Sequence, residues 1–194
     1  MKSPFEINPL IEVNAKTVSA FAYAMKRGAQ ERLRILERNN IILNEKEWYS
    51  QANFLNAFYE VYHRIGEMNL FLIGSSITKF SIFPPMSNLK EALQSLDIAY
   101  HMNHRINGQI LYNKNTGETI DGIGNYTLLD FQEEECKAII QSTSPYPNKF
   151  DEGIIHQLVE NFKPNKQRSH FVKIDSKSYP KNSGQNSCTY IIEW

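Results

Sequence analysis

Residues 99–108 read AYHMNHRING, and at this stretch the character of the chain changes. Upstream, apolar residues recur at helical intervals, whereas short apolar segments separated by Asn- and Gly-rich turns follow downstream. Apolar residues at helical spacing from Leu89 to Tyr100 predict a helix that begins after Asn88. A glycine is typical of a helix end, so Gly108 is expected to terminate this helix. The quoted stretch would then form its last two turns.

Further helices are expected upstream of this stretch. Asn14 is placed to cap a segment with helical apolar spacing, in which Gly28 would leave either one bent helix or two short ones. Asn44 is expected to open the next helix, and Gly66 to close it. Residues 66–83 indicate a buried helix, although the pattern alone does not distinguish it from a strand.

The second half is expected to be mostly strand. Strands are predicted at QILYN, NYTLLDF, CKAIIQS, HFVKI and SCTYIIEW, with one helix at FDEGIIHQLVENF. This order predicts an α+β fold in which N-terminal helices pack on an antiparallel sheet with one inserted helix. We expect one domain over residues 1–194, mainly helical over 1–108 and mainly strand with one helix over 109–194.

Composition limits the classes of partner. Lys+Arg and Asp+Glu both number 21, so no overall field attracts nucleic acid or an anionic membrane. The N-terminal MKSPFEINPL lacks the apolar segment of a secretion signal, and residues 70–73 are too few to cross a bilayer. We therefore expect a cytoplasmic protein without a membrane span or a nucleic-acid partner. Cys136 and Cys188 lie far apart and are expected to be small apolar residues.

The quoted stretch also carries chemistry. On a helix, Asp97, His101 and His104 would share one row at i, i+4 and i+7. His101 or His104 could ligate a metal or contact a ligand, with Asp97 orienting His101 and Arg105 meeting a carboxylate. Alternatively, His and Arg near a helix end stabilise its unpaired carbonyls by about 0.3–1 kcal/mol each. The residues alone favour this second interpretation, because HxxH is a weak metal signal.

Two other features have structural interpretations. The segment STSPYPN at 142–148 is a rigid connection into the following helix and could place Tyr146 in a pocket. Gly153 inside that helix costs about 1 kcal/mol relative to alanine, and close packing of another backbone is the expected compensation. No GxSxG, HExxH, P-loop or EF-hand motif occurs, so we expect no enzymatic activity.

Three segments together carry a resemblance to a known family: residues 99–126 (AYHMNHRINGQILYNKNTGETIDGIGNY), 144–155 (SPYPNKFDEGII) and 184–194 (GQNSCTYIIEW). They resemble bacterial sensor-type domains related to the 4-vinyl-reductase, or hydrocarbon-binding, domains, which share a fold with haem–nitric-oxide-binding domains and TRAPP vesicle-tethering subunits. The similarity covers about residues 88–194. Its most specific part is the ending GxxxCxYxIxW, formed by Gly184, Cys188, Tyr190, Ile192 and Trp194.

The resemblance implies a haem-NO-binding/TRAPP-like ligand-binding domain with a pocket between helices and sheet. It implies a homodimer that binds a small hydrophobic or aromatic molecule and, without an output domain in this chain, regulates a separate signalling protein. The candidate ligand-binding residues are Tyr100, His101, Asn103, His104, Arg105, Asn125 and Tyr126.

Departures from the related domains limit what is carried over. The extra cysteines that hold zinc in related domains are absent, so no zinc site is assigned. The YxSxR motif that accompanies the proximal histidine of haem–nitric-oxide-binding domains is also absent, and the cofactor stays unknown. The leading hypothesis is a non-catalytic small-molecule-binding sensory domain. The alternatives are a TRAPP-like protein-interaction scaffold and, more weakly, a metal- or haem-dependent protein that uses His101 and His104, with Asp97 in the metalloenzyme version.

Overall fold

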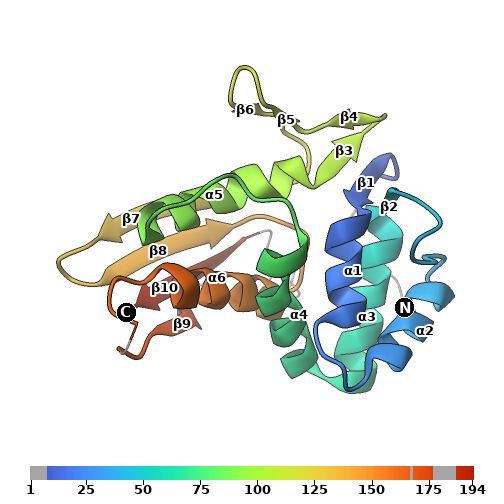
Figure 1. Ribbon diagram of the computed structural model, residues 1–194, viewed down its shortest axis with the longest axis horizontal. Helices are drawn as coiled ribbons and strands as arrows, with labels where there is room; N and C mark the ends of the chain where they lie inside the picture. Colours follow the sequence, from blue (N-terminus) through green and yellow to red (C-terminus); the bar gives the residue numbers. More distant parts are fainter. Residues whose placement is uncertain (1–7, 167, 177–186) are drawn as a thin grey trace.

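The computed structural model describes residues 8–166, 168–176 and 187–194 (Figure 1). In chain order the elements are β1 (Ile11–Asn14), α1 (Ala15–Tyr23), α2 (Ala29–Arg38), β2 (Trp48–Ser50), α3 (Gln51–Ile65), α4 (Glu67–Phe80), α5 (Leu89–Met102), β3 (His104–Ile106), β4 (Gln109–Ile110), β5 (Tyr112–Asn113), β6 (Glu118–Thr119), β7 (Tyr126–Gln132), β8 (Lys137–Ser142), α6 (Asn148–Phe162), β9 (Phe171–Ile174) and β10 (Cys188–Glu193). Helices dominate the first half and antiparallel strands the second, which confirms the predicted α+β fold.

The first helical segment is divided as the sequence suggested. The Asn14 side chain accepts a hydrogen bond from the Lys16 amide at 2.9 Å and caps α1. Gly28 has a left-handed backbone (φ 78°) directly before α2, so the segment forms two helices rather than one bent helix. Residues 67–80 form a helix, and not the strand left open by the pattern.

Two predicted helix boundaries were wrong, because backbone groups that were expected in a helix instead pair with strand β1. Asn44 does not open α3. Residues 48–50 pair with β1, and Ser50 caps the helix that follows. Likewise, Gly108 does not end α5: the helix stops at Met102, and residues 104–106 pair with β1 as β3.

The larger sheet has the strand order β7-β8-β10-β9, and every pairing in it is antiparallel. Along β10, Cys188, Tyr190 and Ile192 are buried, and the Tyr190 hydroxyl donates to the Asn148 carbonyl of α6 at 3.2 Å. The predicted alternation therefore sets the face of this strand that enters the core. Gly184 of the same motif lies outside the described residues.

A second, smaller sheet was not foreseen. It has the order β2-β1-β3-β4 and joins the start of the chain to the segment after α5. Beyond it, β5 and β6 form a hairpin that projects from the body (Figure 1). The segment predicted as one strand, QILYN, is divided between β4 and β5. Among the described residues, no helix is both long and apolar enough to cross a membrane.

The helices α4 and α6 cross with their backbones in contact. A Cβ atom added at Gly74 would overlap the Phe150 carbonyl, and one at Gly153 would overlap the Phe71 carbonyl. Ser75 Oγ reinforces the crossing by donating to the Gly153 carbonyl at 3.2 Å. This is the backbone packing that the cost of a helical glycine predicted, and it joins the sheet and its helices to the helices of the first half.

Replacing Gly153 by alanine tests this crossing. An unhindered Gly-to-Ala change inside a helix stabilises it by about 1 kcal/mol. At position 153 the added methyl group meets backbone, so we expect Gly153→Ala to lower the free energy of unfolding by about 2–4 kcal/mol, measured by urea denaturation. Asn161→Ala, exposed on the same helix, should change it by less than about 0.5 kcal/mol. A stabilised Gly153→Ala protein would contradict the crossing.

Candidate functional site

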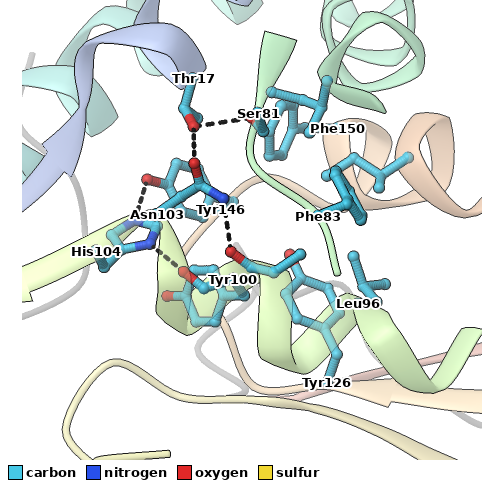
Figure 2. A pocket seen from close by; sticks show the side chains of 13 residues that line it. Thr17, Ser81, Phe83, Leu96, Tyr100, Asn103, His104, Tyr126, Tyr146 and Phe150 are labelled. Atoms are coloured by element: carbon cyan, nitrogen blue, oxygen red, sulfur yellow. Dashed lines mark hydrogen bonds between the residues drawn. The ribbon is translucent and has the colours of Figure 1, made fainter. Parts of the chain in front are cut away.

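A cavity of about 40 Å³ lies between the first-half helices and the sheet (Figure 2). Its apolar wall consists of Ile77, Phe83, Leu96, Ala99, Phe150 and Ile154. Its polar-bearing residues are Thr17, Ser81, Tyr100, Asn103, His104, Tyr126 and Tyr146. The volume exceeds the 10–15 Å³ or so that one water requires and is well below the roughly 150 Å³ of a cavity that accepts benzene.

His104 is positioned by the end of α5. The chain leaves the helix at Asn103, and the His104 side chain folds back so that Nδ1 lies 2.7 Å from the Tyr100 carbonyl oxygen. A carbonyl only accepts, so Nδ1 carries the proton and Nε2 presents its lone pair. Nε2 accepts a hydrogen bond from the Tyr146 hydroxyl at 2.9 Å. Burial lowers the pKa of His104 from its ordinary value of 6.5 to about 4, so the ring is a neutral acceptor at neutral pH.

Tyr146 comes from the SPYP connection between β8 and α6. Prolines on both sides fix its neighbours' backbones, and its ring packs edge-on against Phe58 at a centroid distance of 5.5 Å. A second contact, at 5.2 Å, is to Phe150. Burial raises the pKa of Tyr146, so its hydroxyl stays protonated and acts as the donor to His104. The cavity therefore contains one histidine acceptor, His104 Nε2, which already accepts a hydrogen bond from Tyr146.

The other two lining phenols have partners outside the cavity. Tyr100 donates to the Ile123 carbonyl at 2.6 Å. Tyr126 donates at 2.6 Å to Asp151, a fully buried carboxylate in the first turn of α6, where the helix dipole favours negative charge. Burial raises the pKa of both phenols.

The Asn103 amide holds the cavity's upper wall together. Its Nδ2 donates to the carbonyls of Ile82 and Ala99, both at 2.7 Å. Its Oδ1 accepts from the Ile82 amide at 3.1 Å. It also accepts from the Thr17 hydroxyl at 3.3 Å (Figure 2). All four hydrogen-bonding positions of this amide are thus used within the protein.

The structure separates the seven candidate residues into two groups. Tyr100, Asn103, His104 and Tyr126 line the cavity. The other three lie elsewhere: His101 Nδ1 bonds the Asp97 carbonyl at 2.9 Å, Arg105 pairs with Glu12, and Asn125 bonds Thr143 on the surface. Ligand binding by any of the seven stays a prediction. Tyr146, which the SPYP segment was expected to place in a pocket, also lines the cavity. Gln51 was not predicted, because only the fold brings the start of α3 close to the SPYP connection.

The helix-end interpretation also holds in part. His101 and His104 both bond carbonyls four residues earlier, as a helix-end side chain would. His104 does so as a neutral ring in strand β3, so the single helical row with Asp97 and His101 does not form. Asp97 does lie beside His101, with its carboxylate 3.6 Å from Nδ1. It also accepts from the Tyr126 amide at 2.8 Å, and burial raises its pKa against the effects of Tyr126 and His101. In the described part of the chain, no three His, Cys, Asp or Glu residues are grouped as a metal site requires.

Comparison with known proteins identifies the fold. No model of a known protein family matches the sequence, and no curated protein matches it either. Among solved structures, an H-NOX (haem–nitric-oxide-binding) protein from S. oneidensis in the Fe(II)NO state aligns with a TM-score of 0.58 at 10% identity, covering 93% of this chain and 98% of that one. Its Fe(II) form with three alanine substitutions gives 0.55 at 13% identity, with coverages of 93% and 95%. An H-NOX structure from work on haem distortion aligns with a TM-score of 0.56 at 10% identity, covering 93% of this chain and 94% of that one.

These likenesses define the class by its architecture: the chain has the H-NOX fold. They confirm the haem–nitric-oxide-binding fold that the resemblance predicted. The relation to 4-vinyl-reductase domains is not tested by them and stays a prediction.

The residues of the cavity do not fit a haem in this arrangement. Its volume is about 40 Å³, whereas pockets for drug-sized ligands are roughly 300–1,000 Å³. His104 has the tautomer of a metal ligand, but Tyr146 takes its Nε2. Among the described lining residues there is no Lys or Arg to pair with haem carboxylates, and YxSxR is absent from the sequence.

Titration with ferric haem tests this reading. We expect the wild-type protein and a His104→Leu variant to give the same Soret absorbance, because His104 Nε2 is not free to coordinate iron. The variants are compared at equal concentration with a free-haem reference. A stoichiometric Soret band that His104→Leu abolishes would show that the cavity opens to haem.

The buried neutral state of His104 also predicts a pH dependence. Between pH 6.5 and about 4 the unfolded chain binds this proton and the folded protein does not, so stability falls as the pH falls through that window. The expected loss from this group is on the order of 2–3 kcal/mol in the free energy of unfolding. Urea denaturation at pH 7 and pH 4.5 should show a smaller loss in His104→Leu than in wild type. Equal losses of unfolding free energy in the two proteins would show that protonation of His104 does not contribute to the pH dependence in this range.

Proposed function

We propose that this chain is a non-catalytic sensory domain that binds a small, neutral, largely apolar molecule in the cavity between its helices and sheet. The observation that carries the proposal is a cavity with an apolar wall and a single neutral histidine acceptor, His104. A few placed polar groups in an otherwise apolar pocket are the usual pattern of a ligand site. Solved structures with the same fold include an H-NOX protein in the Fe(II)NO ligation state, which supports a ligand-binding role.

The lining selects the charge of the ligand. None of the described lining residues is Lys, Arg, Asp or Glu. A charged ligand would therefore lose its hydration without gaining an ionic partner, which costs several kcal/mol. Because His104 Nε2 accepts, the preferred ligand is a neutral molecule that offers an O–H or N–H donor to this nitrogen.

We further propose that the domain acts as a homodimer and passes ligand occupancy to a separate signalling protein. Ligand binding can shift the packing at such an interface only if the occupied and empty states differ in the contacts they make. Residues of α1, α4, α5 and α6 line the cavity, so a ligand there would change the packing of four helices at once.

The matched pair cyclopentanol and cyclopentanone tests the site. Both are neutral, and they share a ring and an oxygen, but only the alcohol donates. We expect wild type to bind the alcohol about threefold to tenfold more tightly than the ketone, measured by NMR titration of the ¹⁵N-labelled protein. His104→Leu, of similar size, should bind both equally. Binding without any preference for the alcohol in wild type would reject His104 as the ligand contact.

One observation favours the scaffold alternative. The cavity is small and its histidine is satisfied internally, as would hold for a TRAPP-like protein-interaction module with a filled core. Failure of both probes to bind wild type and His104→Leu, with each protein folded by its NMR spectrum, would favour this alternative over the sensor.

A further inference from the structure

The Tyr146 hydroxyl lies beside two polar groups, and only one of them is bonded to it. His104 Nε2 accepts its proton at 2.9 Å. Gln51 lies about one helical turn before Phe54, whose ring is 6.2 Å from the Tyr146 ring, and its amide lowers the pKa values of Tyr146 and Tyr100 against the larger effect of burial. Gln51 is the first residue of α3, so α3 and β3 each contribute one of the two groups.

The Gln51 amide nitrogen has no hydrogen-bond partner. Gln51 is 1% exposed, and its Nε2 is buried and unpaired. An unsatisfied buried donor of this kind is unfavourable, and buried polar groups in proteins are nearly always paired. A free donor next to an acceptor that a side chain already occupies is the pattern of a binding site closed by its own protein.

We propose that the Tyr146 hydroxyl occupies the place of a ligand oxygen, and that the ligand binds by displacing Tyr146 and contacting both His104 Nε2 and Gln51 Nε2. This inference rests on the proposed small-molecule function and names its ligand class. An oxygen that donates to His104 and accepts from Gln51 is a hydroxyl group. The ligand class is therefore a compact, neutral alcohol or other hydroxyl compound, of which the tyrosine side chain is the internal stand-in.

The size of the cavity supports the displacement. At about 40 Å³ it does not hold a ring compound while Tyr146 is in place. The prolines at 145 and 147 restrict the backbone, so the side chain itself must rotate. Tyr146 thus acts as a gate, and the energy of its bond to His104 is subtracted from the affinity of every ligand that opens it.

Gate opening also reaches the first-half helices. The Tyr146 ring packs against Phe54 and Phe58 of α3, at centroid distances of 6.2 and 5.5 Å. Phe54 and Phe58 contact Phe21 of α1 at 5.6 and 5.1 Å. Displacing Tyr146 therefore requires this aromatic cluster to repack, which carries ligand occupancy toward α1 and α3.

Two conservative variants separate the gate from the pocket. Tyr146→Phe keeps the ring and removes its bond to His104, so it should tighten cyclopentanol and cyclopentanone by the same factor, roughly twofold to tenfold. Their ratio should stay at the wild-type value, because His104 still sets it. Gln51→Met removes the free donor at similar size and should weaken both probes equally, again without changing their ratio. Tyr62→Phe, at a 42% exposed tyrosine, is the matched control and should change neither affinity.

The outcomes distinguish failure of the Tyr146 gate from failure of the proposed small-molecule binding. Affinities that rise in Tyr146→Phe and fall in Gln51→Met support the proposal. If wild type prefers the alcohol but Tyr146→Phe does not bind either probe more tightly, the proposed ligand site is retained and the gate is rejected. If Gln51→Met leaves both affinities unchanged, Gln51 is not a ligand contact and the hydroxyl assignment falls. If neither wild type nor Tyr146→Phe binds either probe, both the proposed function and the gate are rejected.

Discussion

The close crossing of α4 and α6 is the constraint on which the rest of the structure depends. Gly74 and Gly153 allow each helix to rest on a carbonyl of the other, so the two backbones approach more closely than any side chain would permit. Because α6 also lies on the sheet and α4 also contacts α1, this one approach fixes the distance between the sheet layer and the first-half helices. The cavity is what remains between these layers, with Ile77 on α4 facing Phe150 and Ile154 on α6.

Within that space, the polar chemistry depends on where α5 ends. The Asn103 amide satisfies its four positions at the α5 C-terminus and ties Thr17 of α1 to the loop after α4. The chain can then turn into β3, which presents His104 toward the SPYP connection. An extra turn of helix, as predicted to Gly108, would have placed His104 in the row of Asp97 and His101 and away from Tyr146. The pairing of β3 with β1 thus determines which histidine the cavity receives.

Local signals in the sequence were sufficient wherever a structure is decided by neighbouring residues. The Asn14 cap, the α5 start at Asn88 and the alternation along β10 all follow from positions within a few residues of one another. The end of α5 and the start of α3 were missed because both are set by pairing with β1, which lies far away in the chain. For the same reason, only part of the site could be predicted from the sequence. His104 stands out by composition and Tyr146 by its place in the SPYP segment, whereas Gln51 joins them only through the fold.

The H-NOX fold alone does not decide what occupies the cavity, since one fold hosts different sites. What occupies the cavity depends on which hydrogen-bond donors and acceptors the residues around it present. A buried histidine with its Nδ1 proton fixed by a carbonyl can face a metal, a ligand or a protein hydroxyl, and each occupant must satisfy the same lone pair. Here that lone pair faces a tyrosine from a proline-bounded segment, while a glutamine donor beside it stays unpaired. A protein hydroxyl that satisfies the acceptor but leaves the donor unpaired is a poorer occupant than an external hydroxyl able to satisfy both, and this difference is what a ligand would exploit.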